Sequence, residues 1–510
     1  MRKLTALVLI FALVFSLVAC SSAKGNNGTK DIVKIEVSDS KIMVDGKNVS
    51  TKNTDTVYAS NDIVYYEDGK DFTYGEGTSK DAHTAEEAAA HTVVNITKPG
   101  KYSLSGTLSK GQVAVDLGKD AKDDENAVVT LILNGTDITC TVAPAIIFYN
   151  VFECGNTDTE NASKEVNTAS AGANIIISDG TTNNISGSYV ARIYKPDSVE
   201  LNEEKTKVED AKKLHKYDGA FYSKMSMNIG GGSENTGVLN INAENEGLDT
   251  ELHLTINGGI INIKSGNDGI NTNEDKVSVT AINGGEVNIQ VTGETGEGDG
   301  IDSNGWLVIN GGKVTAQACS KSADSGIDSD MGIHINGGTV IATGSMLDRI
   351  ENSGQNHAVF NFAGKQSGKE TISFRDKDNK TVLEFTPKNA YSILIYSSTE
   401  LKEGEYTLYS GEKQLASGDG FGGGGMRPDG MTRPERPEGE ENNFERPNGN
   451  KRPEEMPEFE DREPPEFQGQ HQGGERPQTP AFNNASNTEK TEIFKIQKGA
   501  NIFSGISYLN

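Results

Sequence analysis

One short phrase recurs four times between residues 244 and 343, and it limits the fold more than any other feature of the chain. Each copy contains Ile-Asn-Gly-Gly, beginning at Ile256, Ile282, Ile309 and Ile335, so the steps are 26, 27 and 26 residues. A repeat of about 20–50 residues is typical of stacked supersecondary units. The spacing therefore predicts an array of similar rungs.

The size of the repeat selects the kind of array. A step of 26 residues has room for two or three short strands with Gly/Asn corners, and no amphipathic helix pattern lies between them. A leucine-rich repeat is excluded because its leucine frame is absent, and a propeller blade needs about 40–45 residues. An alternating strand such as 286–289 follows each Gly-Gly, and its Ile and Val can point inward when rungs stack about 4.8 Å apart. The sequence predicts an all-β protein, a parallel β-helix.

Composition divides the rest of the chain. Ten of its 14 prolines lie between Pro428 and Pro480, so that stretch cannot join a ladder and is predicted to be disordered. Within the body we expect a short helix at 84–91 and, inside a charged insertion (189–216), an exposed helix at 199–214. The predicted organisation is a signal peptide (1–20), a tether with one weak strand (21–60), a β-helix (61–370), an antiparallel β cap (371–417), a disordered Pro/Gly/Glu-rich segment (418–490) and a terminal strand segment (491–510).

The first twenty residues have the features of an export signal. A basic start and an apolar run from Leu4 to Val18 precede Ala19-Cys20. Residues 17–20 resemble a bacterial lipobox, in which Cys20 becomes lipidated; ordinary cleavage beside an incidental cysteine is the alternative. No second apolar stretch is long enough to cross a membrane. We therefore expect attachment to the outer face of the cell membrane through lipid on Cys20.

Charge and cysteine content narrow the function further. The formal net charge of −26 argues against nucleic acid as a partner, because such proteins need a basic patch. Three further cysteines, Cys140, Cys154 and Cys319, show no metal-type spacing. Cys140 and Cys154 could form a disulfide, or all three could be buried free thiols.

Stacking the repeats places their acidic residues in two columns. The first column holds Glu246, Asp268, Asp299 and Ser325, and the second holds Asp249, Asn271, Asp302 and Asp328. A glycine after each first-column residue allows a bend, so that the two columns can converge. Carboxylates about 4.8 Å apart repel one another unless a cation lies between them.

Calcium suits such a site, because it binds about six to eight oxygens from Asp, Asn and backbone carbonyls. The alternative is that these side chains bond only to the backbone of their own turns. The predicted calcium ligands are Asp268, Asp299, Asp302, Asp324 and Asp328, with Asn271, Asp249 and Glu246 as further candidates.

Several segments together resemble the carbohydrate-binding β-helix lipoproteins of clostridia and their relatives. The similarity covers roughly 61–415 and is carried by ITKPGKYSLSGTL (96–108), VTLILNGTDIT (129–139), DGAFYSK (218–224) and the serial DGIN/DGID–INGG phrases. The resemblance implies a right-handed parallel β-helix like that of pectate lyases and calcium held by acidic residues of the rungs. It also implies binding of cellulose and of acidic plant-wall polysaccharides such as polygalacturonate.

We therefore expect calcium-dependent, non-catalytic polysaccharide binding at the cell surface. A bound cation can bridge an acidic protein and an acidic sugar. Neutral glucan could instead stack on an aromatic side chain such as Trp306, although a lone Trp more often fills the core. Two alternatives stay open. A pectate lyase needs a base beside the calcium-bound uronate, and a structural surface protein needs no specific sugar. The candidate bases by rung position are Lys264, Lys313, Lys321 and Arg349.

Overall fold

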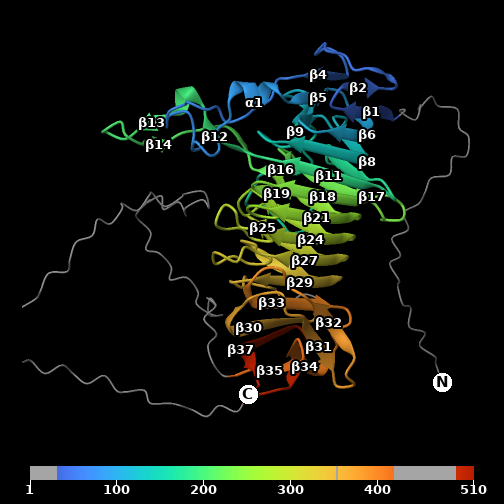
Figure 1. The fold of residues 1–510 in the computed structure, drawn as a ribbon, viewed down its shortest axis with the longest axis vertical. Coiled ribbons are helices and arrows are strands. Elements are labelled where there is room, and N and C mark those ends of the chain that lie inside the picture. Colours follow the sequence, from blue (N-terminus) through green and yellow to red (C-terminus); the bar gives the residue numbers. More distant parts are fainter. Residues whose placement is uncertain (1–31, 352–353, 419–489, 510) are drawn as a thin grey trace, which may run out of the picture.

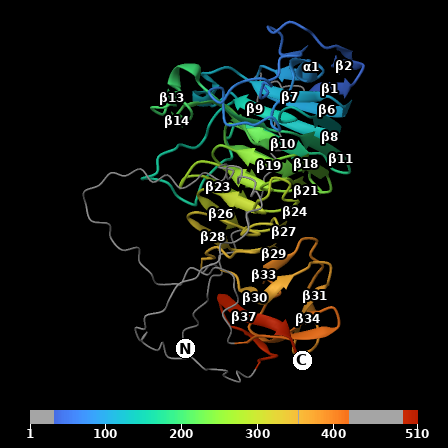
Figure 2. The same ribbon diagram turned by 60° about the vertical axis from the view of Figure 1, so that its left-hand side comes forward.

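The computed structural model describes residues 32–351, 354–418 and 490–509. Within these ranges the chain is all-β, with strands β1 to β37 and one α-helix, α1 (Ala85–Ala89), inside the expected segment 84–91. Two 3-10 turns complete it, η1 (Ala121–Asp123) and η2 (Pro196–Ser198). The strands are piled along the long axis of the molecule (Figures 1 and 2). None of the helices described here is long and apolar enough to cross a membrane.

Each of the first three repeats contributes three strands, one to each of three ladders, and the fourth contributes two strands and an isolated bridge at Ile327. One repeat supplies β19 (Glu246–Thr250), β20 (Leu254–Ile256) and β21 (Ile260–Ser265), which belong to ladders 1, 2 and 3 respectively. Neighbouring rungs pair in parallel within each ladder.

Ladder 1 contains β5 (Thr92–Ile96), β7 (Gly111–Asp116), β9 (Ile146–Asn150), β16 (Gly219–Ser223), β19, β22 (Ile270–Thr272) and β25 (Ile301–Ser303), with β4 (Val57–Ser60) antiparallel at its edge. Ladder 2 contains β6 (Gly100–Leu108), β8 (Val129–Cys140), β10 (Ala173–Ile177), β17 (Met227–Gly231), β20, β23 (Val279–Ile282), β26 (Trp306–Ile309) and β28 (Gly332–Ile335). Ladder 3 contains the far ends of β6 and β8, then β11 (Thr182–Gly187), β18 (Val238–Ala243), β21, β24 (Glu286–Val291), β27 (Lys313–Gln317) and β29 (Thr339–Gly344).

Side-chain alternation explains why the rungs stack. In ladder 3, Ile261 pairs with Val287 and Ile263 with Ile289, and all four side chains are buried in one long core. The residues between them face outward, as a period of two requires. The second glycine of each Gly-Gly turns the corner, because its φ lies in the left-handed region that favours glycine. Those φ angles are +88° at Gly259, +81° at Gly285, +77° at Gly312 and +79° at Gly338.

The one strand expected within the N-terminal tether, at 33–37, is present as β1 (Val33–Ser38), but three further strands follow it where a linker was expected. These are β2 (Lys41–Val44), β3 (Lys47–Asn48) and β4. β1 pairs in parallel with β6, and Ile35 on β1 is fully buried. The Ser/Asn/Lys-rich composition indicated a linker, but alternating Ile and Val in 33–37 are sufficient to extend the core by one strand.

The charged insertion also lacks the helix that the sequence predicted at 199–214. It consists of two antiparallel hairpins, one joining β12 (Val190–Tyr194) to β15 (Lys213–Tyr217) and one joining β13 (Glu200–Leu201) to β14 (Val208–Asp210). Figure 1 shows these hairpins projecting to one side of the stack. The Glu/Lys content favoured a helix, but the segment lacks an apolar helical face, and local pairing decides its conformation.

The stack ends at β29, before the expected boundary at residue 370, because β29 pairs antiparallel with β33 of the cap. A second apolar cluster, which includes Phe360, Phe374 and Phe494, fills the cap. The terminal strand β37 pairs in parallel with β30, and the Pro-rich residues 419–489 lie outside the described residues. The cap strands are β30 (His357–Gln366), β31 (Ile372–Asp376), β32 (Thr381–Phe385), β33 (Tyr391–Ser398), β34 (Gly404–Ser410), β35 (Lys413–Ala416), β36 (Phe494–Ile496) and β37 (Ala500–Tyr508).

The three cysteines of the described chain carry free thiols, so the disulfide between Cys140 and Cys154 is not formed. Cys140 and Cys319 are buried and Cys154 is half-buried. Burial raises the pKa of Cys140 and of Cys154 to about 11, which keeps both thiols protonated and unreactive. Cys20 lies outside the described residues.

Candidate functional site

The two acidic columns predicted from the repeats lie in register on ladder 1. Asp249 is the strand partner of Asn271, which is the partner of Asp302, and the bridge between Ile301 and Ile327 places Asp328 next in that column. In the first column the N–H of Gly247 donates to the carbonyl of Asp268, and the same bond recurs one and two rungs further on. The sequence pattern alone therefore predicted the spatial order of these residues.

Side chains of the first column bond to the backbone of the following rung. Oδ1 of Asp268 accepts from the N–H of Asp299 at 2.6 Å, and Oδ1 of Asp299 accepts from the N–H of Ser325 at 2.5 Å. Asp324 accepts from the N–H of Gly298 at 3.0 Å. These three carboxylates thus bond to the backbone of a neighbouring rung, whereas the alternative to calcium binding was a bond to the backbone of their own turn. Each carboxylate leaves further oxygen lone pairs for a cation.

Glycine is needed between the columns because the backbone of the next rung lies too close to leave room for a side chain. Gly247, Gly269 and Gly300 do not adopt positive φ. A Cβ on Gly247 would lie 2.4 Å from the carbonyl oxygen of Gly269, and one on Gly300 would lie 2.2 Å from that of Gly326. The side chains on either side of Gly247 still converge as predicted, because Glu246 and Asp249 belong to one cluster.

That cluster joins Asp218, Glu246 and Asp249, whose carboxylate oxygens lie within 4.8 Å of one another. All three side chains are buried, with exposed fractions of 4%, 4% and 1%. Asp218 was not among the predicted ligands, although Asp218-Gly219 has the same phase as the later Asp-Gly pairs and could have been included on that ground.

Lys216, at the end of the charged insertion, supplies a positive charge to this cluster. Its Nζ lies 2.5 Å from Oδ2 of Asp218. Burial lowers the pKa of Lys216, but the carboxylates of Asp218, Glu246 and Asp249 outweigh that effect and raise it overall. One ammonium therefore faces three carboxylates, which leaves the cluster short of positive charge.

The cluster, and Asn271 beside it, hold oxygens without hydrogen-bond partners. These are Oε2 of Glu246, Oδ2 of Asp249 and Oδ1 of Asn271, all in buried side chains. Burial, and then repulsion from neighbouring carboxylates, raises the pKa of Glu246 and of Asp249 well above the ordinary range. Unpartnered buried oxygens are costly, and an oxygen-only set of this kind fits a hard cation such as Ca²⁺.

A second acidic group lies lower in the stack. Burial, and then the nearby carboxylates of Asp330 and Asp348, raise the pKa of Asp302 to about 6. Burial and the carboxylates of Asp348, Asp302 and Asp330 raise the pKa of Asp328 to about 8. Burial and repulsion also raise the pKa of Asp268 and of Asp299 well above the ordinary range. These four carboxyl groups therefore hold their protons more tightly than free carboxyl groups do.

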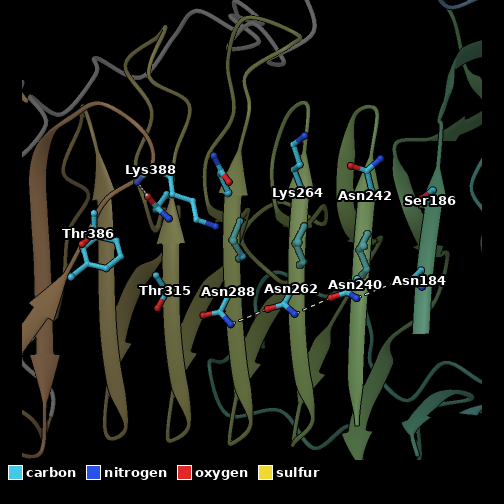
Figure 3. Close-up of a pocket in the computed structure, with 16 residues that line it drawn as sticks. Asn184, Ser186, Asn240, Asn242, Asn262, Lys264, Asn288, Thr315, Thr386 and Lys388 are labelled. Carbon is cyan, nitrogen blue, oxygen red and sulfur yellow. Dashed lines mark hydrogen bonds between the residues drawn. The ribbon is translucent and has the colours of Figure 1, made fainter. Parts of the chain in front are cut away.

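A groove of about 570 Å³ lies on the outer face of ladder 3. Figure 3 shows polar side chains of successive rungs standing in rows across this face. The first row is Asn184, Asn240, Asn262, Asn288 and Thr315, and the second is Ser186, Asn242, Lys264, Gln290 and Gln317.

Asparagines of the first row bond to one another. Nδ2 of Asn240 donates to Oδ1 of Asn184 at 2.9 Å, Nδ2 of Asn262 donates to Oδ1 of Asn240 at 2.9 Å, and Nδ2 of Asn288 donates to Oδ1 of Asn262 at 3.0 Å. We name Asn184, Asn240, Asn262 and Asn288 the amide row. An amide has both a donor and an acceptor, so identical neighbours satisfy each other.

The cap closes one end of the groove through Phe385, Thr386 and Lys388. This wall is held in place by Asn389, whose Nδ2 donates to the carbonyls of Val291 and Ala318 at 2.7 Å each. The N–H of Lys388 donates to Oε1 of Gln317 at 2.7 Å. The end wall is thus tied to β24 and β27.

Of the residues proposed for the rival lyase function, Arg349 is close enough to Asp348 for its charge to oppose the rise that burial causes in the pKa of that carboxyl group. Lys264 and Lys313 lie on ladder 3, where Lys313 pairs with Glu286 at 3.0 Å. Lys321 donates to the carbonyl of Gly293 at 2.6 Å, and Arg349 pairs with Glu351 at 2.7 Å. Trp306 is half-buried on ladder 2.

Comparison with known proteins gives a family but little detail. A carbohydrate-binding domain-containing protein of Acetivibrio thermocellus is 43% identical over 53 residues, which is 10% of this chain and 16% of that protein. The chain therefore spans about a sixth of the length of that curated relative. No solved structure shows a significant match. Residues 90–373, more than half of the chain, match the family described as "Carbohydrate-binding domain-containing protein". The chain belongs to this carbohydrate-binding family.

Proposed function

We propose that the chain is a non-catalytic polysaccharide-binding protein built as a right-handed parallel β-helix of the pectate-lyase type. Three strands per repeat, each pairing in parallel with the next rung, support this architecture. Parallel strands joined by crossovers are right-handed in nearly all proteins. Membership of a carbohydrate-binding family supports the function.

The protein would hold Ca²⁺ in its acidic column, and the unpartnered buried oxygens of Glu246, Asp249 and Asn271 carry this proposal. With Asp218, these residues would form one calcium site, which we call the upper site. Asp302, Asp328 and the first-column residues Asp268 and Asp299 would hold cations lower in the stack, with Asp324 at its edge. The ion would supply positive charge that offsets carboxylate repulsion.

Calcium also explains how a chain of net charge −26 could retain an acidic polysaccharide such as polygalacturonate. The ion reverses the sign of the local field and can bind sugar carboxylates through an open coordination position. Cellulose is the neutral candidate. A lipid on Cys20 would place this activity at the outer face of the cell membrane.

Binding without catalysis is favoured by the charge of Lys216, which lies beside the cluster of Asp218, Glu246 and Asp249 (the upper cluster). A lyase base must be neutral when it removes a proton. Nζ of Lys216 lies 2.5 Å from Oδ2 of Asp218, and in the absence of a bound ion the neighbouring carboxylates outweigh its burial and raise its pKa. Lys216 therefore suits charge balance better than proton abstraction.

The test is co-sedimentation of the full-length chain with polygalacturonate, in calcium and then in chelator, while unsaturated uronide is recorded. We expect calcium-dependent retention without product. Product release would replace binding by lyase activity, and loss of both signals for every glycan would leave a structural surface protein.

A matched pair of variants locates the ion. Glu246→Gln with Asp249→Asn should reduce the calcium-induced rise in the Tm of the protein and weaken retention of polygalacturonate. Glu294→Gln changes an exposed carboxylate and should leave both unchanged. Equal calcium responses in the two proteins would rule out the upper cluster as an ion site.

A further inference from the structure

We propose that the groove on ladder 3 is a second, calcium-independent glycan site that takes a neutral, extended pyranose chain lying along the stack. This proposal rests on the carbohydrate-binding function above and deepens it by assigning a surface and a ligand class.

The groove repeats with the rungs, as a polymer ligand requires. Asn240 is the strand partner of Asn262, and Asn262 is the partner of Asn288, so equivalent side chains recur at each rung. Rungs stack about 4.8 Å apart, which is close to the advance of one sugar unit in an extended pyranose chain. Each sugar would therefore meet the same pair of rows.

The amide row keeps unused hydrogen-bonding capacity. Asn240 and Asn262 each donate one N–H to the neighbouring rung and accept one hydrogen bond in return. An amide has two N–H donors and two acceptor lone pairs, so one donor and one lone pair remain on each half-buried side chain. Hydroxyl groups of a sugar both donate and accept, and they match this pattern. The bonds within the row also fix the amides before a ligand arrives, which lowers the entropy cost of binding.

Charge separates this groove from the acidic column. Lys264 and Lys388 are the titratable side chains among the described residues that line it. Outside this lining, the carboxylate of Glu286 accepts from Asn288 at 3.2 Å and is paired with Lys313. The acidic column belongs to ladder 1, whereas the amide row belongs to ladder 3. Contact with an uncharged glycan in the groove therefore needs no bridging cation.

The cap sets the direction from which the glycan enters. Phe385 and Thr386 close the groove beside β27, and the rows continue in the opposite direction through Asn184 on β11 to Asp137 on β8. A chain end would meet Phe385, whose ring offers an apolar wall to a sugar face.

The experiment measures binding of cellohexaose to the full-length chain by calorimetry, well below its melting temperature, in calcium and in chelator. Asn240→Ala with Asn262→Ala should weaken binding about tenfold or more, equally in both buffers. The matched control is Asn283→Ala with Asn310→Ala. These residues form the same kind of row at an exposed corner outside the groove, with Nδ2 to Oδ1 distances of 2.9 Å to their neighbours, and the control should bind as the unchanged protein does.

Oligomer length gives a second readout that does not depend on variants. Affinity should rise from cellobiose to cellopentaose, because each added unit reaches another rung, and then level off once the groove is filled. A flat length series, unchanged binding in the groove variant, or binding that chelator abolishes would each overturn the inference.

The outcomes also separate this inference from the proposed function. If polygalacturonate is retained but cellohexaose is not bound, the groove site is wrong and the calcium-dependent function stands. If neither glycan binds, the proposed function fails as well. Hexagalacturonate that binds better than cellohexaose in chelator would show that Lys264 and Lys388 select an acidic chain instead.

Discussion

The amide row and the acidic column use the same repeat with opposite consequences. In both, equivalent residues of successive rungs stand in register. Asn262 donates to Asn240 and accepts from Asn288, so it has a hydrogen-bond partner on the rung at either side. Carboxylates can only accept, and repulsion contributes to the raised pKa values of Asp302 and Asp328.

The difference shows that stacking repeats the interaction of one side chain with its neighbour at every rung, whether that interaction is attractive or repulsive. A neutral group with both a donor and an acceptor gains a partner at every rung. A charged group gains a like-charged neighbour at every rung and needs an external counter-charge. Here the counter-charge comes partly from Lys216, and we propose that calcium supplies the rest.

The largest expected loss of stability follows from replacing Lys216. Lys216→Met keeps the length of the side chain but leaves the buried Asp218 carboxylate without its partner at 2.5 Å. Breaking a buried ion pair from one side costs roughly 3–5 kcal/mol, so the free energy of unfolding in chelator should fall by about that amount. Added calcium should restore part of it. Urea denaturation with and without calcium measures both effects.

The control for this variant lies in the same insertion. Lys213 pairs with Glu251 at 3.2 Å, with 40% and 26% of the two side chains exposed. Lys213→Met should cost about 1 kcal/mol or less, because solvent screens exposed pairs. Similar losses from the two variants would show that the upper cluster needs no counter-charge.

The acidic column should also make stability depend on pH. The raised pKa values, about 6 at Asp302 and about 8 at Asp328, lie above the ordinary value of 3.8, so between these limits the folded state binds more protons than the unfolded state. Stability in chelator should therefore fall as pH rises from about 4 to about 8. Thermal unfolding between pH 5 and pH 9 measures the slope.

Asp302→Asn with Asp328→Asn should make that slope shallower, and asparagine fits because Asn271 already occupies the same column. The raised pKa values of Glu246, Asp249, Asp268 and Asp299 should retain the rest of the slope. Asp378→Asn changes an exposed carboxylate in the cap and should retain the slope. A slope that is unchanged in the double variant would show that Asp302 and Asp328 do not contribute to it.

The smallest expected effect is in the amide row. Asn262→Ala removes two hydrogen bonds between half-buried groups that water can replace, so it should cost about 0.5–1.5 kcal/mol. The loss should be the same at pH 5 and at pH 9, because no charge is involved. A loss that changes with pH would contradict the contrast between the two surfaces, and urea denaturation at both pH values tests it.

Much of the acidic column was predictable from the sequence. The repeat of 26 or 27 residues fixes which residues are equivalent, and parallel pairing turns equivalence into register. Asp249, Asn271 and Asp302 therefore stand in line as the pattern indicates. The all-β class followed from the same period, because 26 residues with glycine corners leave room for short strands only.

Other features depended on contacts between segments without a repeat. The strand β1 joins the core although its composition resembles a linker, and the insertion forms hairpins where Glu and Lys favoured a helix. The asparagines of the groove were visible in sequence as ordinary outward strand positions, with no sign that a cap would close one end.

The sequence by itself determined the rungs, their register and the chemistry of each column, because a periodic chain repeats its local preferences at every step. Only the tertiary structure decided which segments lie over those columns. Lys216 reaches Asp218 because the insertion ends beside ladder 1, and Lys388 bonds to Gln317 because the cap folds back over ladder 3. These contacts join segments with no shared period, and long-range packing places them.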